Sequence, residues 1–294
     1  MKREEIIKLY ESYLKMMSSE NTVRSYLFTV NDFFEKNNIC IEEVIPMQVE
    51  YYVNNLDCSY KTKQLRLTAL KSFFSFCYNN RIIKFNPTER IGKIKKTKDD
   101  AKVQEKKNDN KETISELLSQ EKQAELLLAC KNPRDKAIIL TFLKLGLRVS
   151  ELINITLEDY QKAKENDGRL DIVGKGTKYR FVFITDELFS VIDDYLAVRK
   201  ESSDNNLFIS NRGNKMDSSC IGRTIKTLGK RAGFTEEEIS VLHTHLLRDC
   251  FTTNSLDKGV NVALVSLWLG HASVNTTLAH YAKQTVSNMK QIAQ

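Results

Sequence analysis

The amino-acid sequence predicts a mainly α-helical protein with one small β-sheet, organised in two domains. Apolar residues recur at helical spacing along most of the 294 residues, and two β-rich runs flank the turn-like stretch GKGTK. The stretch from 92 to 112 holds almost no large apolar side chain, so it cannot bury a face of its own. We therefore expect a helical domain at 1–91, a charged linker at 92–112 and a second domain at 113–294.

The first predicted domain is built from helices. One helix is expected to begin at Asn21, a favourable N-cap residue, and its apolar face is formed by Val23, Tyr26, Leu27, Val30, Phe33 and Phe34. A later helix ends before Asn86-Pro87, because the residue before a proline avoids the helical region. The early part of that helix carries four basic residues, Lys61, Lys63, Arg66 and Lys71. They are candidate contacts for an anionic partner, although such a run is also typical of a solvated helix face.

The second predicted domain is also mainly helical. One of its helices is expected to be capped by Asn132, to start at Pro133 and to end at Gly146. Residues 169–184 change character, since β-rich runs on either side of GKGTK are the pattern of a β-hairpin. Helical spacing resumes near residue 186 and continues through most of the remaining chain.

Composition narrows the class of protein. Lys and Arg number 45 against 38 Asp and Glu, and the net charge of +7 permits an anionic partner without requiring one. The six cysteines show neither a CxxC pair nor a metal-ligand spacing, which favours buried free thiols in a reducing compartment. No apolar run reaches the roughly 18 residues of a membrane span, and the N-terminus lacks the apolar segment of a signal peptide. We therefore expect a cytoplasmic protein with no membrane partner.

Four motifs in the second predicted domain hold residues that are unusual for a scaffold. The motifs are GLRVSEL, GKGTKYR, HTHLLRDCF and LGHASVNTTLAHY, and their candidate functional residues are Arg148, Lys175, His245, Arg248, His271 and Tyr281. Taken singly, each is more often a surface or packing residue. Taken together, they form a cationic set with one hydroxyl nucleophile, and neither paired carboxylates for Mg²⁺ nor a third ligand for the H-x-H pair accompanies them. Such a set suits chemistry on a phosphodiester.

The order of these motifs resembles the tyrosine recombinases, the family of phage-type integrases and Xer-type recombinases. The resemblance extends over nearly the whole chain. It implies a helical core-binding domain that binds DNA, a linker, and a mixed α/β catalytic domain of the tyrosine recombinase type. The family's motifs mark the same six residues as catalytic, with Glu151 in the acidic position that commonly follows the first arginine.

The resemblance implies that DNA strands are cleaved and rejoined without metal, ATP or another cofactor. Tyr281 Oη would attack the scissile phosphate and leave a 3′-phosphotyrosyl bond with a free 5′-hydroxyl. Arg148 and Arg248 would hold the non-bridging oxygens and stabilise the charge of the transition state. Lys175 would protonate the departing 5′-oxygen.

The histidines of the last two motifs would assist this chemistry. The resemblance implies that His245 takes part in proton transfer from the tyrosine or hydrogen-bonds a phosphate oxygen, and that His271 does the latter. His280, directly before Tyr281, is expected to have no catalytic role. Asp249 departs from the family pattern, because many members have histidine there, but that position is not usually counted as catalytic and activity is still expected.

The function implied is site-specific recombination, as in the integration, excision or resolution of a mobile element or replicon. The expected partner is double-stranded DNA with inverted half-sites, contacted in part by the basic helix around 61–71. The tail after Tyr281 resembles a segment that docks onto a neighbouring protomer, so a homo-oligomer that forms a tetramer in the synapse is expected. Two alternatives remain open: a type IB topoisomerase-like enzyme that relaxes DNA, and a DNA-binding protein without catalysis, against which the complete set of six residues argues.

Overall fold

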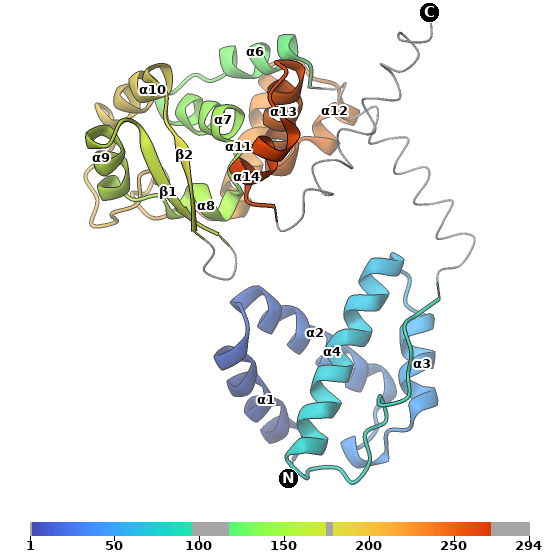
Figure 1. Cartoon of the computed structure of the whole chain (residues 1–294). Coiled ribbons are helices and arrows are strands. Elements are labelled where there is room, and N and C mark those ends of the chain that lie inside the picture. The colour runs from blue at the N-terminus through green and yellow to red at the C-terminus, as the bar shows by residue number, and fades with distance from the viewer. Residues whose placement is uncertain (1, 96–117, 175–178, 272–294) are drawn as a thin grey trace, which may run out of the picture. The chain divides into compact units, whose positions relative to one another are not determined.

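The chain divides into two compact units, residues 1–106 and 107–294, in the computed structural model drawn in Figure 1. The structure describes residues 2–95, 118–174 and 179–271. The described part of the first unit is helical, and its elements are α1 (Arg3–Met17), α2 (Glu20–Asn37), the 3-10 helix η1 (Ile41–Glu43), α3 (Pro46–Asn54) and α4 (Tyr60–Asn79). The predicted linker at 92–112 lies mostly outside the described residues, and the domain borders stay a prediction.

Aromatic side chains form the centre of the first unit. Phe33 and Phe34 of α2 face Phe73 and Phe74 of α4, and all four are fully buried. The ring centroids of Phe33 and Phe74 lie 6.1 Å apart in an edge-on arrangement. Such aromatic pairs contribute about 0.5–1.5 kcal/mol each beyond the area that they bury. The apolar spacing in the sequence therefore corresponds to a helix–helix core.

The start of α2 differs from the prediction. The helix begins at Glu20, and its N-cap residue is Ser19, so the prediction that Asn21 caps it is wrong. Both residue types favour the N-cap position, and the sequence places them two residues apart. The hydroxyl of Ser19 lies 3.0 Å from that of Thr22 in the first turn.

The second unit combines helices with one hairpin. Its described elements are α6 (Gln120–Leu128), α7 (Pro133–Leu145), α8 (Val149–Asn154), α9 (Leu157–Glu165), β1 (Arg169–Val173), β2 (Tyr179–Phe183), α10 (Asp186–Leu196), α11 (Ser218–Arg231), α12 (Glu236–Val241), α13 (Thr244–Asp257) and α14 (Val262–Leu269). Within the described ranges, β1 and β2 make up the whole of the sheet. The predicted fold class, mainly α with a small β-sheet, is confirmed.

Helix α7 lies at the centre of this unit, between α10 on one side and α13 on the other (Figure 1). The Asn132 side chain caps it by accepting a hydrogen bond from the Asp135 N–H at 2.8 Å, and Pro133 is its first residue. Gly146 ends the helix in the left-handed conformation. These three predictions are confirmed. Because nearly all residues of α7 after its first turn are buried, the position of its end is fixed by the core.

The predicted hairpin is confirmed as the antiparallel pair β1 and β2, in which Ile172 lies opposite Arg180. Leu170, Ile172 and Val182 point into the core, and the residues that alternate with them are exposed. Strand β2 also contacts α14, so the hairpin is attached to the helix that precedes His271. The hairpin tip, 175–178, lies outside the described residues.

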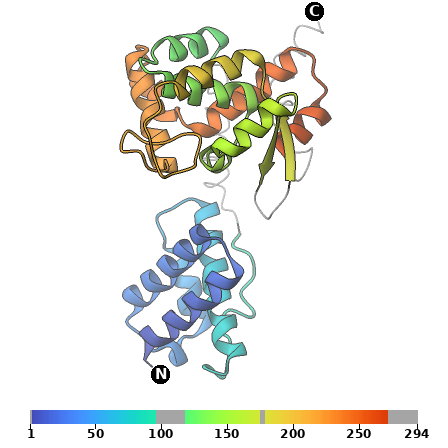
Figure 2. The ribbon, with the colours of Figure 1, turned by 90° about the vertical axis from the view of Figure 1, so that its left-hand side faces the viewer.

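A long connection joins α10 to α11 and runs over the surface of the second unit, as Figure 2 shows. It is anchored by the buried side chains of Leu207, Phe208 and Ile209. Isolated bridges pair Asn206 with Thr156 and Lys215 with Ile209. The loop around residues 210–217 is therefore held in place before the chain enters α11.

Cysteine burial and membrane propensity were also predicted from composition. All six cysteines are free, and Cys77 and Cys250 are the buried ones. Burial raises the pKa of both thiols, which keeps them protonated. The prediction of buried free thiols thus holds for these two, while Cys40 is exposed. Among the described helices, none has the length and apolar character to cross a membrane.

Replacing Gly146 with alanine is expected to destabilise the protein by more than about 2 kcal/mol. The backbone at Gly146 has φ +59°, and a Cβ there would lie 2.5 Å from Phe251 Cδ1 and 2.9 Å from Leu269 Cδ2. Gly259→Ala is the matched control, because Gly259 has φ +78° but open space around it. It should cost only the left-handed backbone, about 1 kcal/mol. Urea unfolding measures both free energies of unfolding. An equal decrease for Gly146→Ala and Gly259→Ala would show that the close contacts at Gly146 add no cost.

Candidate active site of the second unit

The turn after α7 places the first motif arginine. Gly146 ends α7, and Arg148, two residues later, is the N-cap residue of α8. The Arg148 N–H donates to Glu151 Oε2 at 2.7 Å, so the glutamate caps the helix from inside its first turn. Arg148 Nη1 donates to the other oxygen of the same carboxylate at 2.9 Å. The arginine is therefore oriented by Glu151 from both its backbone and its side chain.

Glu151 lies at the centre of three arginines. Its carboxylate also accepts a bidentate pair from Arg180, with Nη1 at 2.7 Å from Oε1 and Nη2 at 2.8 Å from Oε2. Arg248 Nη1 lies 3.8 Å from Oε2. The Glu151 side chain is 2% exposed, so its charge is almost fully removed from water. Three guanidinium groups around one carboxylate leave an excess of positive charge, which suits an anionic ligand.

The second motif arginine comes from α13 and reaches the same place. Arg248 is buried, and it donates through Nη1 to the Gly146 carbonyl at 2.5 Å and through Nη2 to the Leu269 carbonyl at 2.7 Å. These two carbonyls belong to the C-terminal ends of α7 and α14, where main-chain oxygens lack helical partners. Arg248 therefore joins two helix ends whose following residues carry Arg148 and His271.

Electrostatics in this cluster follow from burial and from the neighbouring charges. Burial of the Arg248 guanidinium, reinforced by nearby Arg148, lowers its pKa to about 10, so it remains a cation at neutral pH. Burial alone would raise the pKa of the Glu151 carboxyl, but hydrogen bonds from Arg180 and from the Arg148 N–H outweigh burial and lower it. Glu151 and Arg248 are thus both ionised at pH 7.

The histidines occupy different environments around this cluster. His245 lies in the first turn of α13, three residues before Arg248, and is exposed. His243 is the N-cap residue, and its Nδ1 accepts a hydrogen bond from the Leu246 N–H at 2.9 Å. His271 is half-buried directly after Gly270, whose carbonyl lies 3.4 Å from Arg148 Nη2. Within the described ranges, no three His, Cys, Asp or Glu residues are arranged to hold a metal ion.

Of the six predicted catalytic residues, the structure brings Arg148 and Arg248 together around Glu151 and places His271 after the adjoining helix end. Lys175, Tyr281 and the neighbouring His280 lie outside the described residues. Their assignment rests on the motifs alone.

The basic residues predicted on α4 of the first unit are mostly engaged within that unit. Arg66 stacks on the Phe28 ring, and its Nη1 lies 3.7 Å from Asp32 Oδ2. Lys63 Nζ donates to the Asn54 carbonyl at 2.8 Å, and Lys71 Nζ donates to the Ile91 carbonyl. Lys61 is exposed. Lysines and arginines with such partners must give them up or share them to contact a phosphate. These four residues stay a prediction as DNA contacts.

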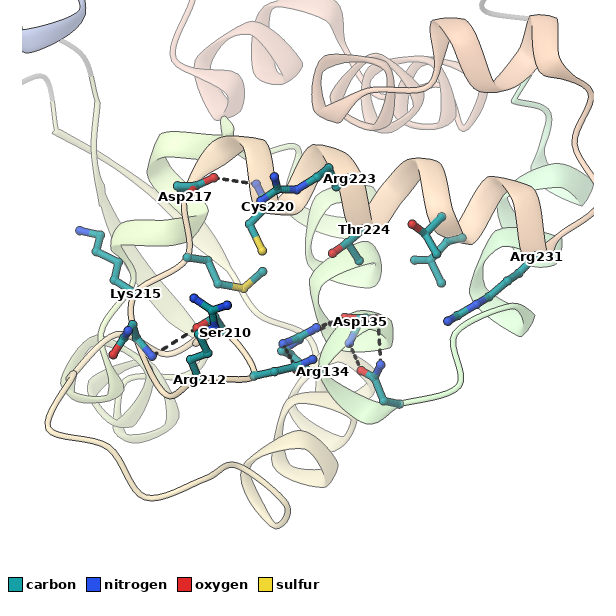
Figure 3. A pocket seen from close by; sticks show the side chains of 16 residues that line it. Arg134, Asp135, Ser210, Arg212, Lys215, Asp217, Cys220, Arg223, Thr224 and Arg231 are labelled. Carbon is teal, nitrogen blue, oxygen red and sulfur yellow. Dashed lines mark hydrogen bonds and ion pairs between the residues drawn. The ribbon is translucent and has the colours of Figure 1, made fainter.

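A second group of cations was not predicted from the sequence. A pocket of about 630 Å³ lies between α11, the N-terminal end of α7 and the loop around 210–217 (Figure 3). We call it the basic pocket; five of its lining residues are cationic, namely Arg134, Arg212, Lys215, Arg223 and Arg231. Arg134 is paired with Asp135, and Lys215 donates to Asn154. The other three make no ion pair with any residue that the structure describes, so their charge is available to an anion.

The fold and the arginine cluster agree with the class of protein that the motif order suggested. The sequence model of the phage integrase family matches residues 111–288, which is more than half of the chain. The chain belongs to this family. The predicted family and the predicted enzyme class, a tyrosine recombinase, are confirmed.

Individual relatives are similar over almost their whole length. The tyrosine recombinase XerC of Thermodesulfovibrio yellowstonii is 30% identical over 280 residues, which cover 90% of this chain and 86% of the relative. The tyrosine recombinase XerA of Pyrococcus horikoshii is 28% identical over 295 residues, covering 98% of this chain and 92% of the relative. Among solved structures, a lambda integrase dimer bound to a COC′ core site has a TM-score of 0.67 at 13% identity, covering 95% of this chain and 77% of that chain.

Proposed function

We propose that the protein is a site-specific DNA recombinase that cleaves and rejoins strands through a 3′-phosphotyrosyl intermediate. The observation that carries this proposal is the meeting of Arg148 and Arg248, from motifs 100 positions apart in the sequence, around Glu151. Guanidinium forks match the oxygens of a phosphodiester, and their charge stabilises the transition state of phosphoryl transfer. Membership of the tyrosine recombinase class supplies the reaction in which such a cluster acts.

The remaining motif residues complete the proposed reaction. The Tyr281 hydroxyl attacks phosphorus, the bond to the 5′-oxygen breaks, and Lys175 gives its proton to that oxygen. His245 accepts the tyrosine proton or binds a phosphate oxygen, and His271 binds a phosphate oxygen. Because the phosphotyrosyl bond keeps the free energy of the broken bond, a 5′-hydroxyl from a second strand can attack it and restore the tyrosine.

The partner in this proposal is double-stranded DNA with inverted half-sites. The relatives named above are recombinases, and the lambda integrase structure was solved as a dimer on a core site. The net charge of +7 and the basic pocket supply charge for phosphate contacts. A tetramer in the synapse, a cytoplasmic location, and the division into a core-binding domain at 1–91, a linker at 92–112 and a catalytic domain at 113–294 belong to the same proposal.

The experiment that tests the function uses the DNA that the purified protein protects. A duplex with its inverted half-sites and a nick near the cleavage position releases the downstream fragment, which traps the covalent intermediate. Wild-type protein should accumulate a DNA–protein adduct without metal or ATP, and absence of an adduct would contradict the proposal. Two intact sites should then give Holliday junctions; relaxation of supercoiled DNA without junctions would favour the topoisomerase alternative.

Reversing one charge of the basic pocket should weaken DNA binding. Arg223 is exposed and lines the pocket, and Arg223→Glu replaces a potential phosphate contact by repulsion. We expect about tenfold weaker binding at 0.15 M salt and a salt dependence reduced by about one released counterion. Lys162→Glu on α9, an exposed lysine already paired with Glu158, makes the same change in net charge and is the control. Equal weakening by both variants would show a general charge effect rather than a binding site.

A further inference from the structure

We infer that Arg180 is a positioning residue for DNA cleavage, which acts by holding Glu151 and, through it, the phosphate-binding arginine Arg148. This inference rests on the proposed function. Arg180 is the second residue of β2, and its side chain is 10% exposed. It comes from the hairpin, whereas Glu151 and Arg148 come from the turn into α8, so the contact joins two separate parts of the domain.

All three nitrogens of the Arg180 guanidinium have partners. The two terminal nitrogens donate to the two oxygens of Glu151, and Nε donates to the Trp268 carbonyl at 2.7 Å. A bidentate arginine–carboxylate pair fixes both position and orientation of the carboxylate. Three of the five N–H groups of Arg180 are therefore used to hold Glu151 and the end of α14, which suits a positioning role.

Arg148 is the most exposed arginine of the cluster, so a ligand reaches it most readily. Its side chain is 31% exposed, against 10% for Arg180 and 6% for Arg248. Its one close side-chain partner in the cluster is Glu151 Oε1, the oxygen that Arg180 Nη1 also holds, and its other terminal nitrogen is 3.4 Å from the Gly270 carbonyl. A shift of the Glu151 carboxylate would thus move the Arg148 fork directly.

The same side chain also supports the end of α14. Gly270 has φ +65°, and a Cβ on it would lie 2.9 Å from Arg180 Cδ. The stem of Arg180 therefore passes directly beneath the residue that precedes His271. Together with the bond to the Trp268 carbonyl, this contact packs the hairpin strand against the helix end whose last carbonyl Arg248 holds.

The test compares Arg180→Lys with Arg169→Lys in the full chain. Lysine keeps the charge of Arg180 but loses the bidentate fork. Arg169 lies on the neighbouring strand of the same hairpin, where it is exposed and paired with Asp171, so it is the matched control. The readouts are affinity for the protected duplex and the single-turnover rate of adduct formation on a nicked duplex. We expect Arg180→Lys to bind within about twofold of wild type and to cleave about 10²-fold more slowly, as a displaced catalytic group does.

Modified phosphates separate positioning from other roles. On a duplex with a scissile methylphosphonate, one non-bridging oxygen and its charge are absent, so the orientation of Arg148 matters less. The deficit of Arg180→Lys relative to wild type should shrink on this substrate by about tenfold or more. A 5′-bridging phosphorothiolate, whose leaving thiolate needs no proton, should leave the deficit unchanged. Rescue by the phosphorothiolate alone would mean that Arg180 acts through the general acid, which contradicts the inference.

Other outcomes are equally decisive. A deficit of the same size on phosphate and methylphosphonate, or a cleavage rate equal to that of Arg169→Lys, would overturn the inference. If Arg180→Lys does not fold, Glu151→Gln breaks the same fork from the carboxylate side and should show the same dependence on substrate. Failure of wild-type protein to form any adduct would count against the proposed function instead.

Discussion

Tyr281→Phe is expected to form no covalent DNA adduct. Phenylalanine keeps the ring but lacks the hydroxyl that would attack phosphorus, so the loss of cleavage should be at least roughly 10⁴-fold. Affinity for the protected duplex should stay within about twofold, because the hydroxyl contributes one contact among many phosphate contacts. The measurement is the fraction of nicked duplex that becomes protein-linked in a single turnover, read after denaturing electrophoresis.

His280→Ala is the matched control for this substitution. The two residues are adjacent, and the sequence assigns the nucleophile to Tyr281 and no catalytic role to His280. His280→Ala should therefore form adduct at a rate within about tenfold of wild type, which is small beside the loss expected from removing a nucleophile. Adduct formation by Tyr281→Phe would identify another hydroxyl as the nucleophile and would remove the assignment on which the reaction rests.

Local signals in the sequence predicted local structure well. Asn132, Pro133 and Gly146 each act within one turn of a helix end, and the structure has all three in the expected positions. The cap of α2 was missed because Ser19 and Asn21 compete for the same role two positions apart. The hairpin was predicted because turn residues and β-rich runs are adjacent in the sequence.

The arginine cluster around Glu151 depends on contacts between segments far apart in the sequence, which the spacing of residues within a motif does not reveal. The motifs mark Arg148 and Arg248, but no local pattern says that Glu151 of α8 pairs with Arg180 of β2. One signal was present: Arg180 lies two residues before the buried Val182 on β2, so period-two spacing puts the arginine on the same inward face. A charged residue in that position needs a buried partner.

The basic pocket could not be predicted from the sequence because its arginines come from separate segments of the chain. Arg134, Arg212 and Arg223 lie at a helix start, in a loop and on a second helix, and each is ordinary for a surface. Only the packing of α11 and the 210–217 loop beside α7 gathers them (Figure 3). Grouping of charges from distant segments is a property of the tertiary fold, and composition gave no more than the net charge of the chain.

Glu151→Ala is expected to destabilise the protein by about 3–5 kcal/mol, the range found when one partner of a buried ion pair is removed. The carboxylate is 2% exposed, and its removal leaves Arg148, Arg180 and Arg248 close together without the carboxylate that they share. The N-terminus of α8 also loses its cap at the Arg148 N–H. Glu187→Ala is the matched control, because Glu187 forms an exposed ion pair with Lys144 and should cost at most about 1 kcal/mol.

The pH dependence of this effect has a defined sign. Because the folded protein holds the pKa of Glu151 below its ordinary value, the stability that its ionised form contributes is complete above that ordinary value. It is lost as the pH falls through the lower, folded pKa, so the difference in urea midpoint between wild type and Glu151→Ala should narrow there.

The double variant Glu151→Ala/Arg180→Ala removes one of the uncompensated cations and should be less destabilised than the sum of the single variants. Equal midpoints for Glu151→Ala and Glu187→Ala at pH 7 would mean that the carboxylate does not hold the arginine cluster together.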